Sequence, residues 1–160
     1  MIKLLALNQN SCKNLSLFDF IKYSKNFNGI ELRFKSIQNC LSKNNTLKDI
    51  KELLDAEVIC GKEHLDIEIK FAGGSDMMSD VLAFGQPGLL LLTGLSNSQS
   101  VRTADIIEAS AVIYVRGKRP DDIGIALAKE KDIPLLCTKY MMYAACGILY
   151  NEGLPGVSTS

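Results

Sequence analysis

The fold is decided by residues 89–116, LLLLTGLSNSQSVRTADIIEASAVIYVR. This stretch begins with an apolar run at 89–93, continues with a helical pattern at 99–109 and ends with a second apolar run at 111–116. Strands that are apolar throughout are typical of parallel sheets whose two faces are both covered. A strand, a helix and a second strand joined by short connections therefore predict a parallel β-α-β unit.

The same alternation of strands and helices continues on both sides of this unit. Apolar or alternating runs predict strands, and apolar residues at spacings of three and four predict helices. The additional strands are expected at 57–60, 67–72 and 134–138, and the additional helices after Thr46 and at 77–84, 120–131 and 140–151. We therefore predict an α/β fold of three layers, with a mostly parallel sheet and helices on both faces.

Glycines and small polar residues mark the ends of these elements. The pair Gly73-Gly74 is expected to break the strand before it, and Ser98 is expected to cap the helix that follows it. Asp76 has two interpretations. It caps the next helix, or it forms with Asp80 a carboxylate pair of the kind that binds metal or does acid–base chemistry. The cap is the interpretation that we favour.

The first 45 residues differ from the rest in composition. They contain seven lysines and arginines against two acidic residues, whereas residues 46–160 contain 11 against 16. Eight of the ten asparagines also lie in the first 45 residues. Residues 1–45 are predicted to form a β-α-β segment, with strands at 2–7 and 30–34 around a helix at 17–27. We therefore predict two parts, an N-terminal segment at 1–45 and an α/β domain at 46–160.

The composition argues against several classes of function. The 18 basic and 18 acidic residues balance, so the chain has no overall signature for binding nucleic acid. The first apolar run is too short for a membrane span or a signal peptide, so we expect a cytoplasmic protein. The five cysteines form no CxxC pair and His64 is the single histidine, which predicts free thiols and no metal site. No catalytic group and no cofactor motif can be identified.

A candidate ligand site lies where the parallel strands end. In open α/β sheets, ligands bind at the carboxyl ends of the strands, and glycines and helix N-termini at that edge suit phosphate groups. A nucleotide or a sugar phosphate is therefore the expected kind of ligand. The candidate binding residues in the three loops at this edge are Gly74, Ser75, Asp76, Thr93, Gly94, Asn97 and Arg116.

The last predicted helix carries no charge from Tyr140 to Tyr150, YMMYAACGILY. A helix that is apolar all round is buried, or one of its faces meets another molecule. The small residues Ala144, Ala145 and Gly147 would allow a second helix to approach closely. Burial within the monomer and a homodimer interface over 140–151 both fit this pattern.

Three runs of sequence resemble the DRTGG domain: KFAGGSDMMSDVLAF, LLLLTGLSNSQSVRTADII and VIYVRGKRPDDIGIALAKEKDIPLLCTKYMMYAACGILYNEGL. The resemblance covers about 46–157. Asp76 and the pair Thr93-Gly94 match residues that name the family, whereas Met77 and Leu95 replace its Arg and its second Gly. The family is similar in fold to the N-terminal domain of HPr kinase/phosphorylase, and the chain has no P-loop. The resemblance implies a regulatory, ligand-sensing or assembly role without catalytic turnover.

Residues 1–55 resemble a different family, the opening of a sugar-phosphate isomerase/epimerase TIM barrel. The resemblance rests on KLLALNQNS and on FIKYSKNFNGIELRFKSIQNCLSKNNTLKDIKELLD, which would supply two of the eight β-α units. It implies, as an alternative function, an isomerase-type enzyme or a remnant of one. A second alternative is a partner in HPr-kinase-like phosphotransfer control.

Overall fold

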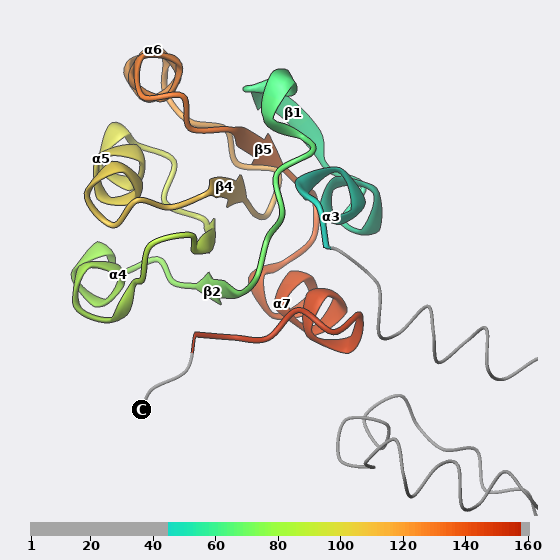
Figure 1. Cartoon of the computed structure of the whole chain (residues 1–160). Helices are drawn as coiled ribbons and strands as arrows, with labels where there is room; N and C mark the ends of the chain where they lie inside the picture. The colour runs from blue at the N-terminus through green and yellow to red at the C-terminus, as the bar shows by residue number, and fades with distance from the viewer. Residues whose placement is uncertain (1–44, 158–160) are drawn as a thin grey trace, which may run out of the picture. The chain divides into compact units, whose positions relative to one another are not determined.

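The structure is a computed structural model and describes residues 45–157, which form one sheet with helices on both sides (Figure 1). The strands stand in the order β1-β5-β4-β3-β2. Strands β2, β3, β4 and β5 run parallel to one another, and β1 pairs antiparallel with β5. The strand bounds are β1 Glu57–Cys60, β2 Ala72–Gly74, β3 Leu90–Thr93, β4 Ala111–Tyr114 and β5 Leu135–Cys137.

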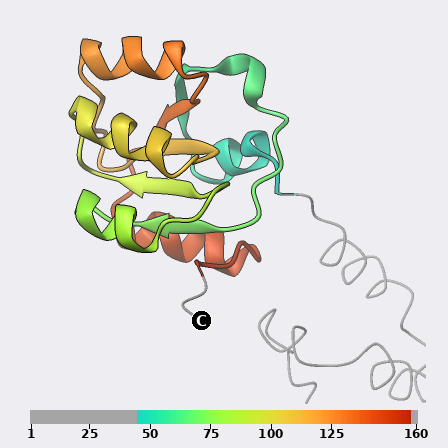
Figure 2. The same cartoon turned by 60° about the vertical axis from the view of Figure 1, so that its left-hand side comes forward.

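The helices form two layers, one on each face of the sheet (Figures 1 and 2). Helices α3 and α7 contribute to the hydrophobic core on one face, and α4, α5 and α6 contribute to the core on the other. The predicted three-layer α/β fold with a mostly parallel sheet is therefore confirmed. The helix bounds are α3 Leu47–Leu53, α4 Met78–Phe84, α5 Ser98–Ile106, α6 Asp122–Glu130 and α7 Met142–Asn151, with a short 3-10 helix η2 at Lys62–His64.

Strands β3 and β4 form the buried centre of the sheet. All eight of their residues are buried, and the side chains alternate between the two cores. Leu90 and Leu92 face the α3 and α7 side, whereas Leu91 faces the α4, α5 and α6 side. Burial on both faces explains why these strands are apolar without alternation.

The prediction of a strand at 67–72 was wrong in position. Backbone carbonyls of Leu65 and Ile67 accept hydrogen bonds from the first two N–H groups of α3. The segment therefore satisfies donors that a helix N-terminus leaves free, and it does not join the sheet as a strand. The strand β2 forms later, at Ala72–Gly74, and contains the two glycines that were expected to end it.

Packing explains why β2 contains glycines. A Cβ atom added at Gly74 would lie 2.8 Å from the Met142 sulfur and 2.9 Å from the Cys146 sulfur of α7. A Cβ at Gly73 would meet the Leu89 side chain at 3.3 Å. Gly74 therefore lets α7 approach the edge strand, and Gly73 leaves room for the Leu89 side chain. Both glycines lie within the strand and do not end it.

The start of α3 is the predicted one, whereas the starts of α5 and α6 differ from the predicted ones by one or two residues. Thr46 and Asp49 form the expected kind of start for α3, a capping box in which each side chain bonds the other residue's N–H. The side chain that caps α5 belongs to Asn97 and not to Ser98, and it accepts a hydrogen bond from the Gln99 N–H at 3.2 Å. Helix α6 begins two residues after Pro120, with Asp121 as its cap.

A chain of buried hydrogen bonds links β4 to the start of α5. The Ser100 hydroxyl donates to the Asn97 carbonyl at 2.8 Å, so the Tyr114 hydroxyl, also at 2.8 Å, donates to the Ser100 oxygen. Burial raises the pKa of Tyr114, so the phenol stays protonated. Within residues 45–157, every buried polar side-chain atom has a hydrogen-bond partner.

No helix in the described range has the length and apolarity needed to cross a membrane. The strands predicted at 2–7 and 30–34 and the helix predicted at 17–27 lie outside the described residues. The boundary between the two parts, placed after residue 45, stays a prediction.

Candidate functional site

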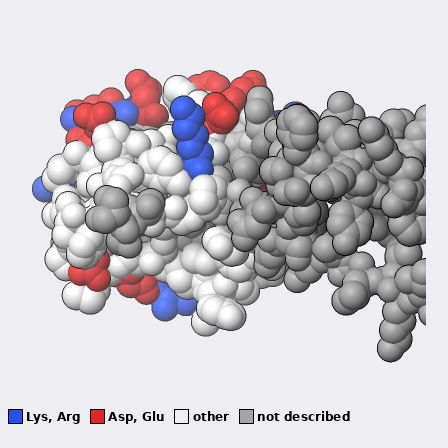
Figure 3. Space-filling view, turned by 60° about the horizontal axis from the view of Figure 1, so that its bottom comes forward, with Lys and Arg blue, Asp and Glu red and all other residues white. Residues whose placement is uncertain are grey.

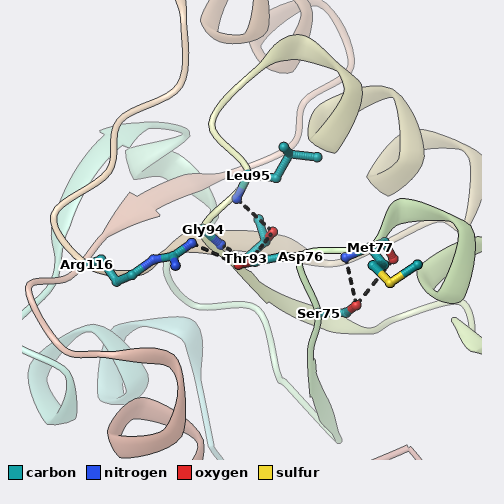
Figure 4. Close-up of polar contacts among 7 residues, drawn as sticks. All are labelled: Ser75, Asp76, Met77, Thr93, Gly94, Leu95 and Arg116. Carbon is teal, nitrogen blue, oxygen red and sulfur yellow. Dashed lines mark hydrogen bonds and ion pairs between the residues drawn. The ribbon is translucent and has the colours of Figure 1, made fainter.

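Three loops meet at the carboxyl edge of the parallel strands. Gly74 pairs with Leu92, and Thr93 pairs with Tyr114, so β2, β3 and β4 end at the same edge. The loop that follows each strand begins there, and Figure 4 shows side chains from all three loops in one cluster. We call Asp76, Thr93, Gly94 and Arg116 the rim cluster.

The Asp76 carboxylate is the centre of the rim cluster (Figure 4). Its Oδ1 atom accepts a hydrogen bond from the Gly94 N–H at 2.6 Å and another from the Thr93 hydroxyl at 3.3 Å. Its Oδ2 atom accepts from Arg116 Nη2 at 2.8 Å, which is also an ion pair. One carboxylate therefore joins the loops after β2, β3 and β4.

The prediction that Asp76 caps helix α4 was wrong. The N-cap position belongs to Met77, which makes no side-chain cap bond. Asp76 instead bonds residues 18 and 40 positions away along the chain. The alternative, a carboxylate pair with Asp80, stays a prediction; within the described part of the chain no group of three or more His, Cys, Asp or Glu side chains is placed to hold a metal ion.

Arg116 reaches the cluster from an uncommon backbone conformation. Its φ is +63°, in the left-handed region that residues other than glycine rarely adopt. The Arg116 N–H donates to the Tyr140 carbonyl at 2.8 Å, and the next N–H, of Gly117, donates to the Thr138 carbonyl at 2.9 Å. These bonds to the loop after β5 hold the backbone turn that directs Arg116 towards Asp76.

Gly94 and Thr93 are also constrained by the cluster. A Cβ atom added at Gly94 would overlap the Arg116 guanidinium, so the arginine needs a glycine beneath it. The Thr93 oxygen accepts a hydrogen bond from the Leu95 N–H at 3.1 Å, and Thr93 is fully buried. Its one hydroxyl hydrogen is therefore available for Asp76.

The other three predicted site residues have local structural roles. Gly74 lies in β2 beneath α7. The Ser75 hydroxyl accepts from the Met77 N–H at 3.0 Å and donates to the Met77 carbonyl at 3.2 Å, which shapes the loop. Asn97 caps α5, so its side-chain oxygen already accepts a hydrogen bond from the Gln99 N–H. The structure thus brings four of the seven predicted residues together through side-chain or backbone contacts.

A shallow cavity lies beside the rim cluster. It has a volume of about 250 Å³ and is lined by Gly74, Ser75, Asp80, Phe84 and Val157, among others. Pockets that enclose drug-sized ligands measure about 300–1,000 Å³. The cavity therefore suits part of a ligand, and a nucleotide would remain largely on the surface.

A second, smaller cavity lies away from the rim cluster. It measures about 70 Å³ and is lined by His64, Glu63 and Asp132, together with Cys60 and Lys129. Its volume corresponds to about two water molecules, at roughly 30 Å³ each. Cys60, which lines this cavity, pairs with Leu135 at the start of β5, so the cavity lies at the edge of the sheet opposite to the rim cluster.

The described thiols are poor candidates for a nucleophile. Cys60, Cys137 and Cys146 are free, and burial raises the pKa of each thiol above its ordinary value. A raised pKa lowers the fraction of thiolate, which is the reactive form. The rim cluster itself contains no cysteine, and its contacts are one ion pair and hydrogen bonds to the Asp76 carboxylate.

No protein-family model and no curated protein sequence matches the chain. Among solved structures, the fold is similar to the CBS and DRTGG domains of the regulatory region of Clostridium perfringens pyrophosphatase, crystallised with the activator diadenosine tetraphosphate. The TM-score is 0.58 and the identity 18%, with 79% of this chain and 60% of that chain covered. This likeness concerns the fold, and it supports the DRTGG-like architecture. The barrel resemblance of residues 1–55 has no support from these comparisons.

The Asp76–Arg116 pair is expected to contribute little to stability. The two side chains are 46% and 38% exposed, and exposed ion pairs contribute about 0.2–1 kcal/mol because water screens them and ordering costs entropy. A double-mutant cycle with Asp76→Ala and Arg116→Ala, followed by urea unfolding, should give a coupling free energy below about 1 kcal/mol.

The Arg119–Glu57 pair provides a matched control for this cycle. Both of its side chains are more exposed than those of Asp76 and Arg116, so its coupling should be smaller. A coupling free energy between Asp76 and Arg116 above about 2 kcal/mol would show that the pair mainly stabilises the fold, and it would contradict the assignment of these residues to a ligand site.

Proposed function

We propose that residues 45–157 form a regulatory, ligand-sensing domain that binds a phosphate-bearing small molecule at the rim cluster and does not convert it. The observation that carries this proposal is the convergence of a guanidinium, a backbone N–H and a buried hydroxyl at the carboxyl edge of the sheet. Donors of these kinds bind phosphate oxygens in proteins, and arginine is suited to them by its planar fork.

The position of the cluster supports the same proposal. Ligands of open α/β sheets bind at the carboxyl ends of the strands, which is where the rim cluster lies. The matched region of the pyrophosphatase is described as regulatory and as complexed with a nucleotide activator. Together these points favour a nucleotide as the ligand class. The isomerase and phosphotransfer alternatives stay predictions, since no described residue favours them.

A thermal-shift screen tests the sensing function. A panel of nucleotides, with diadenosine tetraphosphate among them, and of sugar phosphates should contain a compound that raises the melting temperature of the full chain. A ligand at 100 times its dissociation constant stabilises the folded state by about 2.7 kcal/mol. Arg116→Ala should abolish the response, because it removes the positive charge of the cluster.

Arg102→Ala is the control for this experiment. Arg102 is an exposed arginine on α5, and its replacement removes the same charge from the same domain. The response should survive in this variant. A flat response of the unmodified chain to every compound would contradict the proposed sensing function.

We also propose that the domain forms a homodimer through α7. Ala145 and Leu149 bury one side of this helix against the sheet, while Met141 and Tyr143 are 61% and 92% exposed. Figure 3 shows a broad surface without charges, with charged side chains mostly towards its margins. Large exposed apolar surfaces mark interaction sites, and a two-fold dimer pairs one surface with itself. The proposal combines the two interpretations of the uncharged helix. One side of α7 is buried in the monomer, and the other side is exposed and can pair with a second copy.

Light scattering with size-exclusion chromatography tests the dimer. The full chain should have the mass of two copies, and Tyr143→Glu should reduce the mass to one copy because a charge would be buried in the interface. Ile106→Glu is the control, since Ile106 is 68% exposed but lies on α5 in the opposite layer. A monomer mass for the unmodified chain at all concentrations would show that the α7 surface does not pair.

A further inference from the structure

Three hydrogen-bond donors from separate positions already converge on one anion in this structure. The Gly94 N–H and the Thr93 hydroxyl point at Asp76 Oδ1, and the Arg116 guanidinium points at Oδ2 (Figure 4). The anion is the protein's own carboxylate. The same donors would serve a phosphate group, because both anions present oxygen acceptors at similar spacing.

Two of the donors, and the backbone of the third, are held in place independently of Asp76. The Thr93 oxygen is oriented by the Leu95 N–H, and the Gly94 N–H belongs to the backbone directly after β3. The Arg116 backbone is held by the Tyr140 carbonyl. Removal of the Asp76 carboxylate would therefore leave the Gly94 N–H and the Thr93 hydroxyl in place without their acceptor, with the Arg116 side chain anchored beside them through its backbone.

The Asp76 side chain is more exposed than those of its partners Thr93 and Arg116. It lies in the loop between β2 and α4, its side chain is 46% exposed, and the N-cap of α4 is Met77. The Arg116 guanidinium has five N–H donors, and among the described residues its hydrogen-bond partner is Asp76 through one of them. The pair thus leaves most of the arginine's hydrogen-bonding capacity unused.

We propose that the Gly94 N–H, the Thr93 hydroxyl and Arg116 form a phosphate-binding site whose internal occupant is the Asp76 carboxylate. A ligand phosphate must displace this carboxylate, which acts as a competitor attached to the site. The competitor weakens the binding of single phosphate groups and favours ligands with further contacts. Displacement also frees the loop that leads into α4. The proposal rests on the proposed function for the ligand class, and it adds how the occupancy of the site is controlled.

Calorimetric titration of the full chain with orthophosphate tests the internal occupant. Asp76→Ala should bind orthophosphate at least about tenfold more tightly than the unmodified chain, a factor that corresponds to 1.4 kcal/mol. The double variant Asp76→Ala with Arg116→Ala should lose the gain. Potassium chloride at equal ionic strength replaces phosphate in a parallel titration and should give no binding.

Two further variants make the result specific. Asp80→Ala removes an exposed carboxylate from α4, beside the same cavity, and should leave the affinity unchanged. Asp76→Asn keeps the size of the side chain and removes its charge, so it should also bind phosphate more tightly if Asp76→Ala does not fold, as judged by circular dichroism. An equal gain in Asp80→Ala, or no gain in either Asp76 variant, would overturn the proposal.

The outcomes separate this proposal from the sensing function. If nucleotides stabilise the unmodified chain but the Asp76 variants gain no affinity for orthophosphate, Asp76 is not the internal occupant and the sensing function stands. If the Asp76 variants gain affinity through Arg116 while no nucleotide or sugar phosphate stabilises the unmodified chain, the internal occupant stands and the sensing function fails.

Discussion

The burial of β3 and β4 on both faces is the constraint on which the rest of the structure depends. Every residue of these strands is buried, so helices must cover both sides of the sheet. Polar chemistry is then restricted to the ends of the strands, since a charged group within them would be desolvated without a partner. The parallel arrangement places the ends of β2, β3 and β4 at one edge. The rim cluster is thus a consequence of the architecture.

At that edge, short-range structure and long-range contacts compete for the same side chains. Asp76 stands where a helix cap would be expected, but its carboxylate bonds the loops after β3 and β4. Arg116 adopts a left-handed conformation that its own loop would not favour, and backbone bonds to the loop after β5 hold it there. Local strain and an unused cap in one small region are features that proteins retain at functional sites more often than elsewhere.

The contacts of the rim cluster agree with the proposed displacement of Asp76 by a ligand. The ion pair of the cluster is partly exposed and therefore weak, whereas the Thr93 and Gly94 donors and the Arg116 backbone are fixed by the strands and by backbone bonds. An anion that replaces Asp76 would keep the donor geometry and would change the loop before α4. These properties are the ones that the proposed ligand-sensing function requires.

Most of the architecture could be predicted from the sequence, because apolar runs and helical spacing depend on local burial alone. The strands of 89–116, the helix between them and the three-layer fold followed from these patterns. The carboxyl-edge rule also placed Asp76, Thr93, Gly94 and Arg116 in the candidate site.

The errors arose where distant parts of the chain decide the outcome. Gly74 of β2 is required by the sulfur atoms of Met142 and Cys146 on α7, about 70 residues later in the chain, and local rules treat glycine as a breaker. Asp76 was assigned as a cap because its true partners are 18 and 40 residues away. Asn97 was included in the site although it caps α5, since both roles suit an asparagine before a helix.

The most direct test of the account is a nuclear magnetic resonance titration of the ¹⁵N-labelled full chain with ATP. The central claim is that the carboxyl edge of the sheet receives a phosphate group. The amide signals of Gly94, Leu95 and Ser75 should then move most, because a new anion would replace or shift the Asp76 carboxylate beside them. The signals of His64 and Asp132, at the second cavity, should stay in place. Largest changes at His64 and Asp132, or no change at Gly94 at saturating ATP, would contradict the account.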